Sequence, residues 1–276
     1  MLPWNYGFHW NLTSYIFLGA FYTVLVVVAT TMFHALWRSR RALRSDQAEA
    51  IRWAANFHDL PARDRACRHA LTGEAPGREC PHAFDCRHCE THPRFLAAHP
   101  PSPAGPEDAD IFGLAFPQDR FYHRGHTWAR PETDGTVTVG LDDLGQRLLG
   151  TPDAIDLPMP GTPIRANGLA FRIRKRNADV RVLSPIDGEV VAIGGPDRDW
   201  LLRVKPLGET FDLRHLLTGA EVKAWVMREL ERLQLTLSME GAAPTLADGG
   251  VPVADIAASY PEADWDAVCG EMFLEA

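Results

Sequence analysis

The sequence has a deficit of positive charge and lacks the motifs of common catalytic sites. Its 28 lysines and arginines are outnumbered by 36 aspartates and glutamates, which gives a net charge of −8. Because nucleic-acid binding needs a basic surface, we expect no nucleic-acid partner. The sequence has no glycine-rich phosphate loop, and no nucleophile, base and orienting acid can be assembled from it. We therefore expect a binding or accessory protein and not an enzyme.

Charge is also missing from residues 14–37, which contain no Asp, Glu, Lys or Arg over 24 positions. At about 1.5 Å per residue, a helix of this length crosses a hydrocarbon core of roughly 30 Å. No lysine or arginine precedes the segment, which argues against a cleaved signal peptide. Four arginines follow it within residues 38–44. By the positive-inside rule, we expect a single-pass helix in a bacterial-type inner membrane, with the N-terminus outside and the later domains cytoplasmic.

Cysteine is sparse, but four of the five cysteines fall within residues 67–89: Cys67, Cys80, Cys86 and Cys89. The last two form a Cys-x-x-Cys turn, and four thiolates are the ligand set of structural zinc and of iron-sulfur clusters. A cytoplasmic location disfavours structural disulfides. We expect a metal site with these four ligands and zinc as the metal. An iron-sulfur cluster, a redox-active thiol pair and unrelated free thiols are the alternatives.

The longest patterned stretch, residues 167–194, predicts paired strands. Leu169, Phe171 and Ile173 alternate with arginines and alanine, which is the pattern of a half-buried strand. A second apolar run follows at 180–183. The turn Ser184-Pro185-Ile186-Asp187-Gly188 then precedes a further strand at 189–193. These residues predict an antiparallel hairpin with a second turn behind it.

This stretch resembles the lipoyl-domain hairpin of the glycine cleavage system H protein, and its flanks extend the resemblance. YHRGHTWAR at 122–130 and GTVTVGLDDLGQRLLG at 135–150 are similar to the family's first strands and short helix. SPIDGEVV at 184–191 and DWLLRVKP at 199–206 resemble its later strands. The resemblance covers roughly residues 118–225 and implies a lipoyl-type β barrel-sandwich domain.

The resemblance also implies a lipoylated lysine at the hairpin tip, eight residues before the proline of a Pro-x-x-Gly-Glu turn. Counting back from Pro185 leads to Asn177, whose amide cannot be acylated as a lysine amine can. Lys175 lies two residues earlier, and Arg174 stands where an acidic residue is usual. We therefore expect a degenerate lipoyl domain without bound lipoate. A lipoyl carrier that uses Lys175 is the alternative.

The hairpin is also the basic part of an acidic protein. Five positive side chains are predicted at its tip, where they would form a docking surface for an acidic partner or for anionic lipid: Arg172, Arg174, Lys175, Arg176 and Arg181. A solvated hairpin without a partner explains the same charges.

Outside the lipoyl-like region, the sequence predicts helices at 45–60, 221–239 and 262–273 and a proline-rich linker. We expect an α+β protein in five parts: an anchor (1–44), a helix with the four-cysteine module (45–98), the linker (99–117), the H-protein-like domain (118–220), and a C-terminal helix with an acidic tail (221–276). Its expected role is that of an accessory or adaptor subunit in a membrane complex, for example a respiratory one. An electron-transfer subunit with an iron-sulfur centre is a further alternative.

Overall fold

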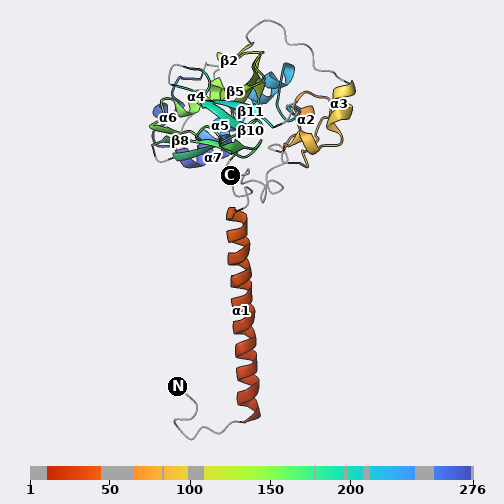
Figure 1. Ribbon diagram of the computed structural model, residues 1–276, viewed down its shortest axis with the longest axis vertical. Helices are drawn as coiled ribbons and strands as arrows, with labels where there is room; N and C mark the ends of the chain where they lie inside the picture. The colour runs from red at the N-terminus through yellow and green to blue at the C-terminus, as the bar shows by residue number, and fades with distance from the viewer. Residues whose placement is uncertain are drawn as a thin grey trace. The chain divides into compact units, whose positions relative to one another are not determined.

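The computed structural model describes residues 11–44, 65–82, 84–98, 109–176, 178–195, 198–207, 212–239 and 252–274. The chain divides into two compact units, Met1–Ala48 and Glu49–Ala276 (Figure 1). The predicted helix at 45–60 and most of the predicted linker lie outside the described residues.

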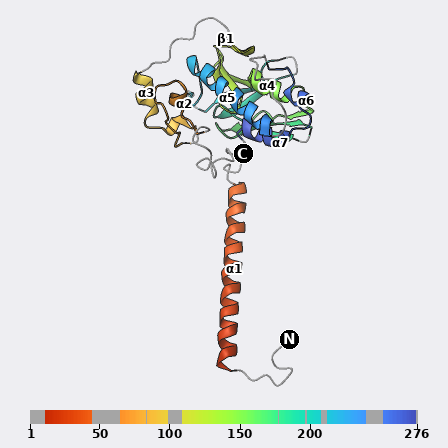
Figure 2. The same cartoon turned by 180° about the vertical axis from the view of Figure 1, so that it is seen from behind.

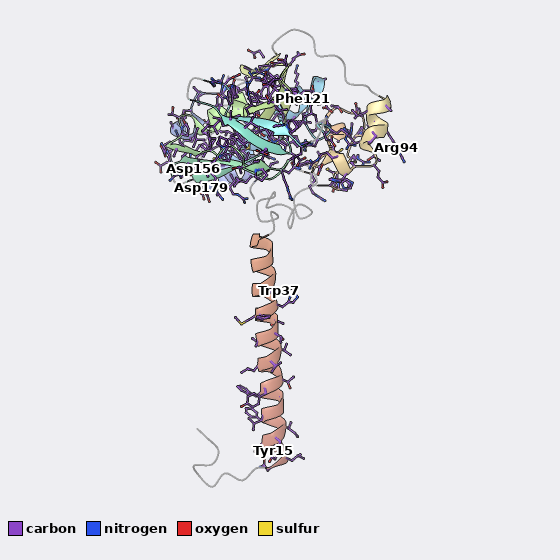
Figure 3. All side chains as sticks on the ribbon, viewed as in Figure 1. Tyr15, Trp37, Arg94, Phe121, Asp156 and Asp179 are labelled. Carbon is purple, nitrogen blue, oxygen red and sulfur yellow. The ribbon has the colours of Figure 1, made fainter. Side chains whose placement is uncertain are left out.

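Within residues 11–44, which the structure describes, the first unit forms the helix α1 (Leu12–Arg44). Its segment Ser14–His34 has a mean hydropathy of 2.2, and no residue in the most apolar part of that segment is buried. Tyr15 and Trp37 lie toward opposite ends of the helix (Figure 3). A helix of this length and composition could be a membrane span or a signal sequence. The inner membrane and the orientation stay predictions.

The second unit is built on antiparallel sheets. The larger one has the strand order β3-β4-β5-β11-β10-β7, and a smaller one has the order β6-β8-β9. The strands of the larger sheet are β3 (Phe121–Tyr122), β4 (Thr127–Pro131), β5 (Val137–Leu141), β7 (Pro163–Ile164), β10 (Gly188–Ile193) and β11 (Leu202–Pro206). Those of the smaller sheet are β6 (Ala154–Asp156), β8 (Leu169–Lys175) and β9 (Ala178–Leu183).

Four of the helices of this unit belong to the same core as the sheets. They are α4 (Asp143–Leu149), α5 (Ala220–Met239), α6 (Ile256–Ser259) and α7 (Trp265–Met272). In Figure 2, α5 and α7 lie across the near side of the unit. Trp225, Val226, Trp265 and Phe273 are buried in the same core as the strands. The C-terminal helices are therefore part of the H-protein-like core, and the predicted boundary at 220/221 does not separate two bodies.

The predicted linker extended too far toward the C-terminus. Residues 109–116 form a hairpin of β1 (Ala109–Ile111) and β2 (Leu114–Phe116). Its apolar side chains Ile111, Leu114 and Phe116 are buried in the main core, because the hairpin packs beside α4. The cysteine module precedes it and contains α2 (Arg68–Leu71), the 3-10 helix η4 (Cys86–His88) and α3 (His92–Ala98).

Candidate functional site

The β8–β9 hairpin carries the predicted lipoyl position at its tip. Lys175 and Ala178 are the last paired residues of the two strands. Arg176 has a φ of +53°, which is typical of a tight hairpin turn, and its N–H donates to Asp153 at 2.6 Å. Asn177, the position that matches the family's lysine, lies outside the described residues. The described strand ends nonetheless fix where the tip starts.

Lys175 is one of only three lysines in the chain, with Lys205 and Lys223. Its side chain is buried, and its Nζ donates to the Thr151 carbonyl at 2.6 Å and to Asp255 Oδ2 at 3.2 Å. Strand geometry explains this burial, because residues two apart share one face. Ile173 is buried on that face. The amine is thus held inside the domain and is not presented to a modifying enzyme in this conformation.

Asp255 holds the C-terminal segment against the hairpin. It caps α6 by accepting the N–H of Ala258 at 2.8 Å. Burial alone would raise its pKa, but the hydrogen bonds from Ala258 and Lys175 outweigh burial, and the pKa of Asp255 is lowered. Gly150 has a φ of +56°, and a Cβ there would lie 2.0 Å from Asp255 Cγ. Glycine is therefore required where α4 ends against Asp255.

The basic surface at the tip is smaller than predicted. Lys175 and Arg181 are buried, at 9% and 5% exposure, so the expectation of five exposed charges was wrong. Lys175 faces the core, and Arg181 lies in β9, against which α7 packs. Arg172, Arg174 and Arg176 remain at least partly exposed. They are the part of the predicted surface that a partner could reach.

Two of these arginines have acidic neighbours on the same sheet. Arg172 lies 3.6 Å from Asp179, and Arg174 lies 3.5 Å from Asp156. Figure 3 shows both aspartates at one edge of the domain. Exposed pairs of this kind contribute little stability, but they reduce the net charge that a partner meets.

Three of the four predicted metal ligands are buried. Cys67 and Cys80 pack in one small core cluster, and Cys86 is also buried. Cys80 Sγ accepts the N–H of Phe84 at 3.3 Å. Cys89 is partly exposed, and its Sγ lies 3.2 Å from Thr91 Oγ1. The four thiols thus occupy two different environments.

None of the five cysteines forms a disulfide, and Cys269 is buried. Among the residues that the structure describes, no three His, Cys, Asp or Glu side chains form a group that could hold a metal ion. Metal binding by the four cysteines, with zinc or an iron-sulfur cluster, stays a prediction.

Thiol acidity differs within the module. Burial raises the pKa of Cys86 to about 11, although the neighbouring Arg68 and Arg124 oppose that rise. At Cys89, burial would also raise the pKa, but hydrogen bonds from Thr91 and His92 outweigh it and the pKa is lowered. The thiol of Cys89 therefore loses its proton more readily than the thiol of Cys86.

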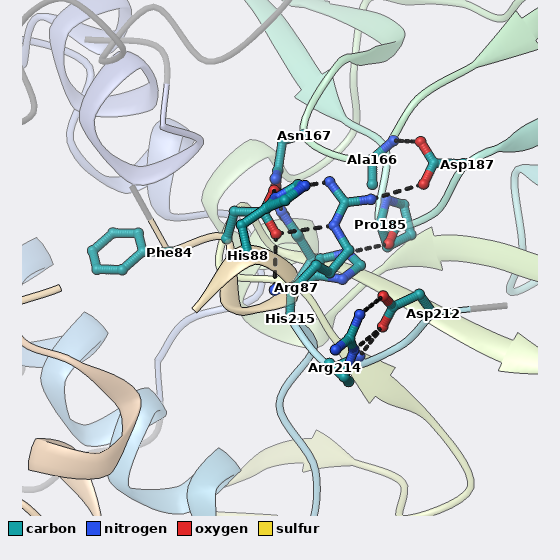
Figure 4. Close-up of polar contacts among 12 residues, drawn as sticks. Phe84, Arg87, His88, Ala166, Asn167, Pro185, Asp187, Asp212, Arg214 and His215 are labelled. Atoms are coloured by element: carbon teal, nitrogen blue, oxygen red, sulfur yellow. Dashed lines mark hydrogen bonds and ion pairs between the residues drawn. The ribbon is translucent and has the colours of Figure 1, made fainter. Parts of the chain in front are cut away.

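The cysteine module contacts the turn at 184–188, which carries the family-like motif (Figure 4). Arg87 Nη1 lies 2.7 Å from Asp187 Oδ2, and Arg87 Nε donates to Asp85 at 2.9 Å. His215 Nε2 donates to the Pro185 carbonyl at 2.7 Å. The contacts of Arg87 with Asp187 and of His215 with Pro185 could not be predicted from the sequence, because the partners are 100 and 30 positions apart and carry no local signal.

His126 lies in a second buried polar network. Its Nδ1 is 3.0 Å from Asp142 Oδ2, and its Nε2 is 3.9 Å from Glu229 Oε2. Burial lowers the pKa of His126, but Asp142 more than compensates and the pKa is raised. The side chain has no exposed surface. His126 therefore belongs to the interior of the domain, between Asp142 and Glu229.

Comparison with known proteins gives the family. The glycine cleavage H-protein family matches residues 120–195. Glycine cleavage system H protein 2 of Pseudomonas syringae pv. tomato is 35% identical over 119 residues, which are 39% of this chain and 93% of that protein. Its namesake from Pseudomonas aeruginosa is 34% identical over 125 residues, 41% of this chain and 96% of that protein.

Among solved structures, a glycine cleavage system H protein from Mycobacterium marinum is 25% identical, with a TM-score of 0.32. The match covers 38% of this chain and 94% of that one. Both of these sequence relatives are covered over nearly their whole length, and the family match at residues 120–195 falls on the part of this chain that forms the sheets. Through that domain, the chain belongs to the glycine cleavage H-protein family.

Proposed function

We propose that the protein is a non-catalytic accessory or adaptor subunit of a membrane complex, in which the H-protein-like domain docks a partner and carries no lipoyl group. The observation that carries the proposal is the buried amine of Lys175, held by Thr151 and Asp255. Lys175 is the lysine nearest to the tip, since Lys205 lies in β11 and Lys223 in α5. The position that matches the family's lysine is Asn177.

The apolar helix α1 supports the membrane part of the proposal. Ser14–His34 is long enough to span a bilayer, and arginines follow it at 38, 40, 41 and 44. In the proposed orientation, these arginines and the second unit face the cytoplasm. Other subunits of the complex are the proposed partners, and Arg172, Arg174 and Arg176 are the proposed contact residues.

The cysteine module has a structural role in this proposal. It is short and contains little regular structure, so a metal ion would add stability that burial alone does not supply. Cys67, Cys80, Cys86 and Cys89 are the proposed ligands, and zinc is the proposed metal.

Intact-mass analysis of the full chain from its native membranes tests the central claim. We expect no lipoyl mass increment on the wild-type chain. The variant Asn177→Lys, expressed with a lipoyl ligase, is the matched positive control and is expected to gain the increment, because it restores an amine at the family position. A lipoyl group on wild-type Lys175 would contradict the proposal and support the carrier alternative.

A further inference from the structure

A groove of about 500 Å³ lies between the cysteine module and α5. Ala70 and Leu71 line it from the module, and Ala224 and Met227 line it from α5. Charged side chains line the rest of it: Arg78, Glu79, Arg228 and Glu231. The volume lies within the range of roughly 300–1,000 Å³ that is usual for small-molecule sites. The groove thus combines an apolar surface with a few charged groups.

A smaller cavity of about 20 Å³ adjoins the groove and shares Ala66, Leu71 and Arg228 with it. Arg124, Glu229 and Arg232 also line this cavity. Its volume holds roughly one water-sized group. We call it the arginine recess.

Buried polar atoms without hydrogen-bond partners gather around the recess and groove. Among the described residues they include Arg124 Nη2 and Arg232 Nε in the recess and Arg78 Nε in the groove. Native proteins leave few buried donors unpaired, and a cluster of them marks a place where water or a ligand binds. Three of the four such atoms around these cavities are N–H donors, which favour an acceptor, and the fourth is Glu229 Oε2, a carboxylate oxygen that lies 2.9 Å from Arg232.

The charges of the recess point to an anion. Glu229 already has neighbours, since its Oε1 accepts from Trp225 at 3.0 Å and its Oε2 lies 2.9 Å from Arg232. Arg124 donates to the Ala66 carbonyl at 3.3 Å and lies 3.9 Å over the Phe84 ring. In the described part of the chain no carboxylate lies within ion-pair distance of Arg124. Its positive charge is therefore not balanced by a contact.

We propose that the groove binds a small organic anion, with one oxygen of its carboxylate in the arginine recess and a short apolar body along Leu71, Ala224 and Met227. Arg124 Nη2 is a charged donor without a hydrogen-bond partner, which favours Arg124 as the residue that receives the head group. This site is separate from the hairpin tip and does not depend on the adaptor role.

Calorimetric titration of the full chain in a non-ionic detergent, with hexanoate as the probe, tests the site. We expect a dissociation constant below about 1 mM for hexanoate. Hexan-1-ol, which lacks the charge, and acetate, which lacks the apolar body, are expected to bind at least about tenfold more weakly, because each makes only half of the contacts. Absence of wild-type binding, or equal binding of the three probes, would overturn the proposal.

Two variants on one helix locate the ligand. Met227→Glu introduces a negative charge into the groove and is expected to weaken hexanoate binding at least about tenfold. Leu235→Glu is the matched control, because Leu235 lies on the same helix, is 51% exposed against 44% for Met227, and does not line either cavity. Arg124→Gln, checked for its fold by circular dichroism, is expected to weaken binding to the same degree as Met227→Glu. Equal effects of Met227→Glu and Leu235→Glu would refute the assigned location.

Discussion

The guanidinium of Arg68 forms a two-pronged ion pair with the carboxylate of Glu221 and connects the cysteine module to the first turn of α5. Nε donates to Oε1 at 2.9 Å, Nη2 contacts Oε2, and Nη1 donates to the Arg214 carbonyl. The Arg68 side chain is 5% exposed and that of Glu221 is 18% exposed. A pair this buried holds the module on the domain. Removal of one partner leaves the other charge buried without a counter-charge, which destabilises the folded protein.

Glu221→Gln is therefore expected to lower the free energy of unfolding by about 3 kcal/mol, because Arg68 stays buried without its counter-charge. Urea unfolding followed by circular dichroism measures the loss. Glu79→Gln is the matched control: its ion pair with Arg65, at 2.7 Å, has a 44% exposed carboxylate and is expected to contribute less than about 1 kcal/mol. Similar losses in the two variants would contradict the role assigned to Arg68 and Glu221.

The burial of Lys175 predicts a pattern of chemical labelling. With an amine-reactive ester at limiting concentration, Lys205 and Lys223, which are exposed, should be labelled at least about tenfold faster than Lys175, because the Lys175 amine is bonded on two sides. Peptide mass spectrometry measures the three rates in one sample. Asp255→Asn removes one partner and is expected to speed labelling of Lys175 alone. Equal labelling rates for Lys175 and Lys205 in the wild-type chain would show that the Lys175 amine is accessible, and would contradict the buried position described for it.

Much of the hairpin and its helices could be predicted from local patterns. Val222, Val226 and Leu233 recur at helical spacing and are buried in α5, and Phe171 and Ile173 alternate with arginines in β8 as expected. The same alternation predicts that Lys175 is buried, because residue 175 follows residues 171 and 173 on one face of the strand. The charge of Lys175 argues for exposure, but the period of the strand decides where its side chain lies.

Contacts between distant residues could not be predicted in this way. Lys175 and Asp255 are 80 positions apart, and Arg68 and Glu221 are 153 apart. No spacing rule connects them, because the partner is chosen by the fold and not by the local chain. β1 and β2 could not be predicted for another reason: each strand has only three residues, too few for a periodic signal.

The four-cysteine proposal predicts one equivalent of zinc per full chain, measured by elemental analysis. Single changes Cys67→Ser and Cys89→Ser are each expected to lower the zinc content and the melting temperature, because thiolate ligands act together. Cys269→Ser is the control and should keep the metal, since that thiol is buried in the main core away from the module. A coloured protein that contains iron would instead support the electron-transfer alternative. Absence of any metal would contradict both.

A pH dependence of stability follows from His215. Burial lowers its pKa to about 4, and the nearby Arg87 contributes to the same shift. In the unfolded chain the imidazole takes up a proton below about pH 6.5, whereas the folded protein excludes that proton until about pH 4. The free energy of unfolding should therefore fall as the pH falls from 6.5 to 4, by an amount on the order of 3 kcal/mol from this residue.

His215→Asn removes this titration and is expected to reduce the pH dependence between pH 6.5 and 4, while an asparagine amide can still donate to the Pro185 carbonyl. Urea unfolding at a series of pH values measures the slope. His123, whose pKa burial lowers to about 3, titrates in an overlapping window, so the difference between variant and wild type isolates His215. His88→Asn, with a side chain that is 76% exposed, is the control and should leave the slope unchanged. An unaltered slope in His215→Asn would show that His215 is not the group that takes up the proton on unfolding.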